Sequence, residues 1–370
     1  MLTAFDDYPV HQTPLPLAQP GGGHPDFYDR FWFNGYTEDA YFAVALGTYP
    51  NRGVIDAAFS VVADGVQRSV FASGRAPLER AETAVGPIRV RVVEPMRAAE
   101  VEVDAPEQGL RARLRFDTRT PVCEEKRHTR HAGARLVMDV TRATQLGRWS
   151  GELTSGDRTL RADGWFGTKD RSWGVRSVGD PAPMAPVPAE AQYFFLWAPL
   201  HFDVECLHYM VFEDADGEVW GRTAARLPVI GAGDPVVGPE LGIAPLSSVS
   251  HEVRWAKGLR RGDGATLRVR RAADGPEETV ELEPLVTFRM SGAGYFHPDY
   301  PHGRWHDELM VAGEEFAVVD LDNTEARNIH VQQVVRARRG GVTGLGVLEQ
   351  LVFGPHAPSG FTDLLGGHPG

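Results

Sequence analysis

The chain has 370 residues and a formal net charge of -12, and this length suits two domains or one fold built twice. Because the balance is acidic and no long run of lysine or arginine occurs, binding to nucleic acid is not expected. The start of the chain does not read as a signal peptide, and no apolar run is long enough to cross a bilayer. We therefore expect a soluble cytoplasmic protein without membrane insertion.

Residues 1–24 are rich in proline and glycine and show no periodicity, which is typical of an extended surface arm. Ordered structure is expected to begin near Phe27. From there, apolar and polar residues alternate over short runs, which is the period of half-buried strands. The clearest of these runs are residues 88–94, 110–116, 266–271 and 279–283.

Dipeptides suited to hairpin turns lie between the strand-like runs. They are Asp64-Gly65, Asp216-Gly217, Asp274-Gly275 and Gly340-Gly341. Helical periodicity is scarce, so the fold class predicted is all-β, with antiparallel strands closing into barrels or sandwiches. Regular alternation stops for about twenty residues after Leu227, which is longer than a usual connection. This interruption predicts an N-terminal β-domain over residues 25–240 and a C-terminal β-domain over residues 241–370.

The stretch GWFGTKDRSWGVR, residues 164–176, combines charge with two tryptophans and precedes a proline-rich loop at residues 178–190. As a strand it would place Asp170 on one face with Phe166, Thr168 and Ser172, and Lys169, Arg171 and Trp173 on the other face. A carboxyl group in such surroundings can act as a general acid, a general base or a structural ion-pair partner. All three roles stay open for Asp170.

The segment GYFHPDYPHGRWHDEL holds His297, His302 and His306 beside several carboxylates. Imidazoles at this density can bind a metal, shuttle protons, line a polar pocket or stand in solvent. Their spacing matches no recognised metal-binding pattern, so no metal site is assigned. Nucleotide-binding glycine motifs are missing as well, and no cofactor is expected.

Polar side chains also interrupt apolar strand faces. Glu349 shares a face with Val347, Leu351 and Phe353, and a carboxylate in that position needs a partner or a function. If residues 201–212 form one strand, His208 lies on its apolar face and His201 on the other. The aromatic side chains Trp32, Trp197, Tyr295 and Trp305 lie near these polar groups in the sequence, as in a pocket for a bulky apolar molecule.

The motif GWFGTKDRSWG, residues 164–174, resembles the G-x-x-x-x-D-H-x-W-G signature of the carotenoid 1,2-hydratases (hydroxyneurosporene synthases) and their AttH-like relatives, among them lipocalin-like Diels-Alder cyclases. Residues 330–361 and the segment HGRWHDEL resemble the second half of an uncharacterised bacterial branch of this group. The resemblance implies two lipocalin-like β-barrel domains packed side by side, with a hydrophobic pocket in or between them. It also implies chemistry without a cofactor on isoprenoid or polyketide substrates.

In this resemblance, Asp170 matches the aspartate that donates a proton to an alkene, and Trp173 matches the tryptophan of the signature. Arg171 stands where the family has histidine, and arginine cannot act as a base at neutral pH. A water-activating base would then come from His201, His297 or His306, or from Glu349. The side chains expected to contact substrate are Trp32, Arg171, Trp173, Arg176, Trp197, Tyr295 and Trp305.

These observations predict a non-redox acid–base enzyme that hydrates, dehydrates, isomerises or cyclises a bulky terpenoid or polyketide. One alternative is a carrier that binds such a lipid without changing it. Another is a metal-dependent hydrolase built on His297, His302 and His306. The expected partner is a small apolar molecule, and a second copy of the chain, forming a homodimer, is the one macromolecular partner left open.

Overall fold

The computed structural model describes residues 14–176 and 191–370, and nearly all its regular structure is β-strand. The proline-rich loop at 178–190 and residues 1–13 of the predicted arm lie outside the described residues. Within these ranges the helices are short 3-10 turns, namely Gly21–Gly23, Pro50–Arg52, Pro106–Gln108, Met290–Ala293, Val318–Leu321 and Ala357–Ser359. None of them could span a membrane. The all-β prediction is confirmed.

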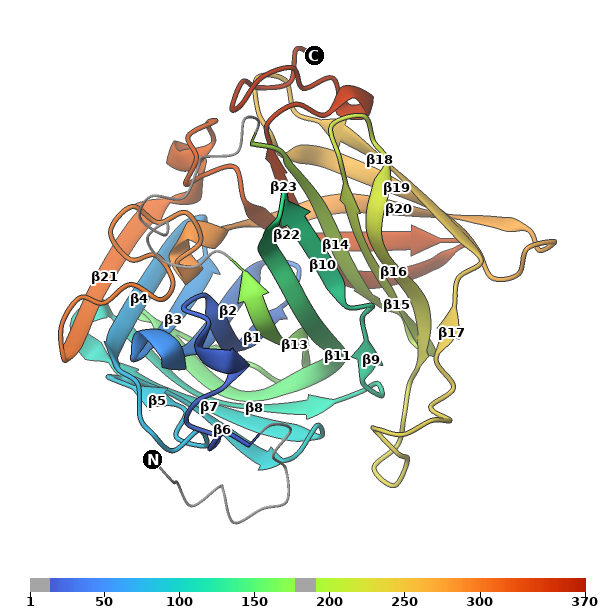
Figure 1. The fold of residues 1–370 in the computed structure, drawn as a ribbon. Coiled ribbons are helices and arrows are strands. Elements are labelled where there is room, and N and C mark those ends of the chain that lie inside the picture. The colour runs from blue at the N-terminus through green and yellow to red at the C-terminus, as the bar shows by residue number, and fades with distance from the viewer. Residues whose placement is uncertain (1–13, 177–190) are drawn as a thin grey trace.

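The first sheet contains fourteen of the described strands. They are β1 (Phe27–Tyr36), β2 (Ala40–Tyr49), β3 (Val54–Ala63), β4 (Val66–Arg75), β5 (Ala84–Val85), β6 (Ile88–Glu94), β7 (Ala98–Ala105), β8 (Leu110–Thr118), β9 (Cys123–Glu124), β10 (His128–Ala132), β11 (Arg135–Ser155), β12 (Arg158–Arg161), β13 (Trp165–Arg176) and β21 (Leu309–Ala317). Their main order is β21-β4-β3-β2-β1-β13-β11-β8-β7-β6-β5. Figure 1 shows β21, from late in the chain, beside β4.

This sheet curls into a nearly closed barrel. The turn between β5 and β6 reaches the opposite edge, where a Cβ at Gly86 would meet Val311 of β21 at 3.1 Å. Aromatic rings fill the barrel interior, with Trp149 5.1 Å from Phe42 and 5.3 Å from Phe116. Within the described residues, the barrel interior is therefore a packed core and does not form a hydrophobic pocket.

A row of three glycines makes room for these rings. Gly35, Gly167 and Gly147 are direct neighbours across β1, β13 and β11. A Cβ at Gly167 would lie 2.3 Å from Nε1 of Trp149, and one at Gly35 would lie 2.3 Å from the ring of Phe42. Close approach of an indole to the backbone, and not turn geometry, therefore requires glycine in this row.

The second sheet is an open half-barrel of nine described strands in the order β17-β16-β15-β14-β23-β22-β20-β19-β18. They are β14 (Tyr193–His201), β15 (Glu205–Glu213), β16 (Val219–Pro228), β17 (Ala244–Pro245), β18 (Ser248–Trp255), β19 (Gly262–Arg270), β20 (Glu277–Arg289), β22 (Val331–Arg339) and β23 (Val342–Phe353). Residues 201–212 are not one strand, because the chain turns between His201 and Glu205 to form a hairpin.

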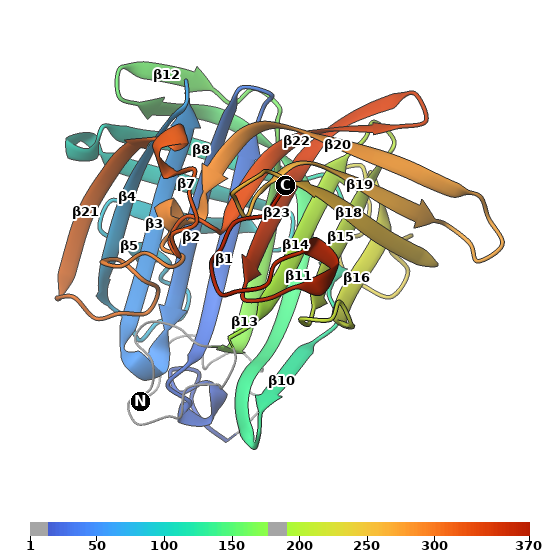
Figure 2. The same cartoon turned by 90° about the horizontal axis from the view of Figure 1, so that it is seen from above.

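The two sheets pack against each other through a third core, separate from the core of each sheet. The first sheet contributes Trp32, Tyr41 and Val62 among others, and the second contributes Phe195, Trp197, Met210, Phe212, Val334 and Leu351. Figure 2 shows the half-barrel beside the strands that supply this face. The polar groups described below lie within this inter-sheet region.

The sheets do not divide the chain at the predicted border near residue 240. Residues 193–228 already belong to the second sheet, and the position 240 lies between its strands β16 and β17. Residues 309–317 return to the first sheet as β21. The loss of alternation after Leu227 therefore marks a long connection within one sheet.

Hairpin turns occur where the turn dipeptides predicted them. Asp64 and Gly65 both have positive φ, 51° and 75°, which is the backbone of a type I′ turn between β3 and β4. Gly340 and Gly341 also both have positive φ, and they form the turn between β22 and β23. The run at 88–94 coincides with β6, and the run at 110–116 lies within β8.

Candidate functional site

Asp170 lies in the middle of β13, which is paired on both sides. Its direct neighbours are Trp32 on β1 and Thr144 on β11. The residue is 7% exposed, and its side chain belongs to the face of the first sheet that packs against the second. Oδ2 lies 3.8 Å from Nη2 of Arg142, and Oδ1 has no hydrogen-bond partner among the described residues. The carboxyl group is thus buried, and its ion pair with Arg142 is long. Its Oδ1 atom can make one further polar contact.

Burial raises the pKa of Asp170 to about 6. The guanidinium groups of Arg142 and Arg30 oppose this rise, whereas the negative charges of Glu125 and Glu349 add to it. A carboxyl group with this pKa is partly protonated near neutral pH. It can therefore give up a proton as well as accept one.

Glu125 is the second carboxylate beside Arg142 and behaves differently. Burial alone would raise its pKa, but a hydrogen bond from His208, the charge of Arg142 and a hydrogen bond from Thr144 lower it to about 2. The distances to Oε1 are 2.9 Å from Nε2 of His208 and 3.0 Å from Oγ1 of Thr144. Glu125 is a fixed anion, and Asp170 is the carboxyl group of this pair that titrates near neutral pH.

Glu349 forms a hydrogen-bonded network that connects the sheets. Its two oxygens accept hydrogen bonds from Nε2 of His330 at 2.7 Å and Nε2 of Gln332 at 2.5 Å. Gln332 in turn accepts from Asn34 at 3.0 Å and from the hydroxyl of Tyr41. Nε2 of His330 faces Glu349, and Nδ1 of the same ring is buried with no hydrogen-bond partner among the described residues.

Aromatic rings join Asp170 to the histidine of this network. Trp32, the cross-strand neighbour of Asp170, lies edge-on to Tyr295 with ring centroids 6.1 Å apart. Tyr295 is 4.8 Å from the ring of His330, and its hydroxyl accepts a hydrogen bond of 2.9 Å from Arg30. Trp197, 3% exposed, belongs to the same inter-sheet core. These residues place a carboxyl group, an imidazole and aromatic faces in one region.

Arg171 and Trp173, two expected substrate contacts, lie on the opposite face of β13 from Asp170. Arg171 stacks on Phe31 at 3.9 Å and donates a hydrogen bond of 2.7 Å to Asp29. Trp173 is 37% exposed. The alternation of the strand accounts for both positions, because odd and even residues point to different sides. Arg171 is an ion-pair partner of Asp29, not of Asp170.

His201, at the end of β14, is fully buried, but it contacts β13 at Phe166, four residues from Asp170. Its ring stacks on Phe166 at 4.4 Å, and Nε2 is 3.3 Å from the carbonyl oxygen of Gly167. Burial, together with the charge of Arg119, lowers the pKa of His201 well below its usual value. It is a neutral packing residue. The structure does not bring it to the carboxyl group of Asp170.

The three histidines at 297–306 do not converge. His297 donates to Glu314 at 3.2 Å, and His302 accepts a hydrogen bond of 3.1 Å from Arg30. Among the described residues, no three His, Cys, Asp or Glu side chains are grouped so as to hold a metal ion. Trp305 is 45% exposed and stacks with Arg75, away from Asp170.

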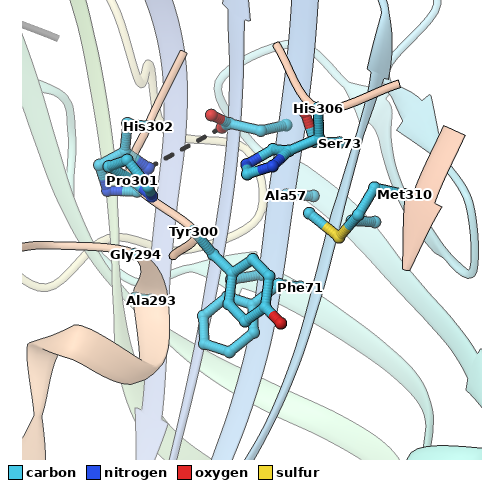
Figure 3. A pocket seen from close by; sticks show the side chains of 13 residues that line it. Ala57, Phe71, Ser73, Ala293, Gly294, Tyr300, Pro301, His302, His306 and Met310 are labelled. Carbon is cyan, nitrogen blue, oxygen red and sulfur yellow. Dashed lines mark ion pairs between the residues drawn. The ribbon is translucent and has the colours of Figure 1, made fainter. Parts of the chain in front are cut away.

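A cavity of about 20 Å³ lies beside His302 and His306, and Figure 3 shows these rings with Ser73 around it. This volume holds about one water molecule, so it is not a substrate pocket. Nδ1 of His302 is 3.9 Å from Asp56, and burial with the charge of Arg30 lowers the pKa of His302 to about 4. His302 is therefore a neutral support for Arg30.

Sequence reasoning did not single out Arg30, Arg142 and Glu125, and it named His208 only as a polar residue on an apolar face. Arg142 lies in the run VTRAT, where alternation indicates a strand but not its neighbours. Each of these residues showed the same sequence pattern, which is an ionisable side chain on a strand face that is otherwise apolar. The pairing of β1, β11 and β13 places Arg30 and Arg142 around Asp170, whereas Glu125, His208 and His330 come from other parts of the chain.

No curated protein matches this sequence. A solved structure of a candidate AttH protein from Nitrosomonas europaea is similar to this chain, with a TM-score of 0.53 and 14% identity. The alignment covers 92% of this chain and 98% of that chain. At this identity the likeness shows an AttH-like fold and nothing of activity, so the fold implied by the motif at 164–174 is confirmed. Residues 2–362 match the model of the Family of unknown function (DUF8625), and the chain belongs to that family.

Proposed function

We propose that this protein is an acid–base enzyme that needs no cofactor and acts on a bulky apolar molecule held between the two sheets. Asp170 donates the proton. The observation that carries the proposal is a buried carboxyl group with a pKa raised to about 6, one oxygen of which is free of hydrogen bonds to the described residues. Such a group is rare in a merely structural role, because an unpartnered buried carboxyl group costs stability.

Proton transfer from Asp170 to an alkene carbon leaves a carbocation and the Asp170 carboxylate. Arg142, 3.8 Å away, stabilises the new carboxylate. The electron-rich faces of Trp32 and Trp197 stabilise the cation, because aromatic quadrupoles attract positive charge. The same chemistry serves hydration, isomerisation and cation-driven cyclisation.

His330 completes the reaction as the base. Its free Nδ1 takes a proton from an attacking water molecule for hydration, or from an adjacent carbon for isomerisation or cyclisation. Glu349 holds the other ring nitrogen at 2.7 Å and stabilises the imidazolium that forms. Glu349 is thus a positioning residue.

The test is conversion of a panel of isoprenoid alkenes and polyketide acids in water enriched in deuterium and oxygen-18. Mass spectrometry detects deuterium at carbon after isomerisation, and both labels after hydration. We expect labelled product with the wild type and none with Asp170→Asn. Asp139→Asn is the matched control, because Asp139 lies on the adjacent strand in an ion pair with Arg127 at the surface. Labelling by Asp170→Asn at the wild-type rate would disprove the proposal.

A ligand that copurifies unaltered, together with no label in any product, would instead indicate a carrier. The ionisable groups argue against this alternative, because a carrier of apolar molecules does not need a buried acid, a free imidazole nitrogen and two carboxylates at its binding surface.

A further inference from the structure

Three arginines surround two small residues on β13, beside Asp170 in the inter-sheet region. Ser172 is the direct neighbour of Arg30 on β1 and of Arg142 on β11. Gly174 and Arg176 follow on the same face. Because neighbouring strands are about 5 Å apart, the Arg30 and Arg142 side chains begin on either side of Ser172. We call Arg30, Arg142 and Arg176 the arginine cluster.

The arginine cluster has few partners within the described chain. The guanidinium of Arg142 makes no hydrogen bond to any described residue, and its two carboxylate contacts are 3.8 and 4.0 Å long. Arg176 has no carboxylate within 4.0 Å among the described residues and stacks on the ring of Tyr28 at 4.6 Å. Arg30 is 2% exposed and donates only to neutral groups, the hydroxyl of Tyr295 and the ring of His302.

Two of the three cations therefore lack a carboxylate partner within the described chain. Buried guanidinium groups ordinarily pair with an anion, because loss of hydration is costly. Nε of Arg30, Nε of Arg176 and the hydroxyl of Tyr28 are buried without hydrogen-bond partners among the described residues. All three groups can donate, and Tyr28 is the cross-strand neighbour of Gly174. The residues with these unused donors thus lie on neighbouring strands around Ser172 and Gly174.

The two residues between these donors are small. Gly174 has φ of 134°, and a Cβ there would lie 2.1 Å from the carbonyl oxygen of Asp139, so no side chain fits. Ser172 adds only a hydroxymethyl group. An oxyanion over Ser172 and Gly174 would meet forked donors on both sides, which is the arrangement that binds carboxylate and phosphate groups.

We infer that the arginine cluster binds the anionic head group, a carboxylate or phosphate, of the molecule on which Asp170 acts. Successive residues on the same face of a strand are about 7 Å apart, so a head group over Ser172 lies about that far along β13 from Asp170. The apolar body then runs along Trp32 toward the inter-sheet core. This inference rests on the proposed function and narrows its substrate class to apolar molecules that carry an acidic head group.

The test uses geranic acid, geranyl phosphate and geraniol, which share one apolar chain and differ in the head group. Each is titrated into the full-length protein at about pH 7.5, where the carboxyl group is ionised, and binding is measured by calorimetry. We expect at least one anion to bind about tenfold or more tightly than geraniol. The tighter of the two anions identifies the head group as carboxylate or phosphate.

Arg176→Gln should remove about tenfold of anion affinity and leave geraniol binding unchanged. Arg176→Lys should restore part of the lost affinity, because lysine has the positive charge but not the two parallel donors of a guanidinium. The matched control is Arg148→Gln, which lies on β11 and on the same face as Arg142, six residues along the strand. Circular dichroism and thermal unfolding check that each variant folds.

Geraniol binding as tight as that of both anions would overturn the inference. So would an equal loss of anion affinity in Arg148→Gln, or failure of all three probes to bind at millimolar concentration. Asp170→Asn should bind the anions at least as tightly as the wild type, because it removes a nearby negative charge. If the anions bind through Arg176 but the wild type turns over no substrate, the acid–base proposal fails and the head-group site stands.

Discussion

Oδ2 of Asp170 lies 3.8 Å from Nη2 of Arg142, and the same guanidinium reaches Glu125 at 4.0 Å through Nη1. One cation is therefore shared by two buried carboxylates. Hydrogen bonds from His208 and Thr144 fix the charge on Glu125, and none does so for Asp170 within the described chain. The difference in hydrogen bonding separates the two pKa values and makes Asp170 the titrating member of the pair.

The stability of the protein should report the pKa of Asp170. Its folded-state pKa is raised from 3.8 to about 6, so its contribution to stability is present below pH 3.8 and is lost as pH rises through about 6. This rise corresponds to about 3 kcal/mol of unfolding free energy. Relative to the wild type, Asp170→Asn should gain up to this amount between pH 4 and 7. Urea unfolding across this range measures the difference. The same pH dependence of the unfolding free energy in both proteins would contradict the raised pKa of Asp170.

The proposed reaction should slow as pH increases. Only protonated Asp170 can donate, so kcat/KM should fall about tenfold per pH unit above about 6. The initial rate of label incorporation, measured between pH 5 and 8, gives this profile. A rate that stays constant over the range would mean that Asp170 is not the acid.

Glu349→Gln should lose activity and about 1–3 kcal/mol of stability, because His330 and Gln332 lose a charged acceptor. Glu213→Gln is the matched control. Glu213 lies on the opposite face of the same sheet from Glu349 and likewise accepts a hydrogen bond from a histidine, 3.0 Å long, from His356. It should lose similar stability and keep full turnover. Equal losses of turnover in the two variants would show that Glu349 acts only through folding.

Gly167→Ala should destabilise the protein by ~2–3 kcal/mol, at the upper end of overpacking costs. The new Cβ would lie 2.3 Å from Nε1 of Trp149 and 2.3 Å from the carbonyl oxygen of Asn34. Gly233→Ala serves as the control, because no heavy atom lies within 4 Å of a Cβ there. Thermal unfolding measures both. A loss below about 0.5 kcal/mol for Gly167→Ala would mean that the indole moves aside at little cost.

Local features of this fold could be predicted from the sequence because they depend on near neighbours. Alternation within 164–176 predicts the strand β13 and the face that carries Asp170, and the Asp64-Gly65 pair predicts its hairpin. Alternation does not determine which face of a strand meets another sheet. That face is determined here by apolar residues of the second sheet, such as Phe195 and Leu351, that are remote in sequence.

The site itself was only partly predictable. Asp170, Glu349, Trp32, Trp197 and Tyr295 were expected, and the structure brings them to one region. The neighbours that distinguish Asp170 are Arg142 on β11 and Glu125, which directly follows β9. The pairing of β9 and β13 with β11 brings them to Asp170, and alternation does not predict this pairing. The histidines at 297 and 306 were expected near the acid because of their density in the sequence, but the loop places His297 against Glu314 and His306 at the small cavity.

The return of β21 to the edge of β4 has a consequence for synthesis of the protein. On the ribosome, β4 emerges roughly 230 residues before its partner, which at 5–20 residues per second is a delay of roughly ten seconds or more. Until then the backbone hydrogen-bonding groups along one side of β4 are unpaired, as on any exposed sheet edge. The first sheet is completed only after most of the second has been translated. The nascent chain therefore carries an unprotected edge for most of its elongation, and a chain released early, before residue 309, would keep it.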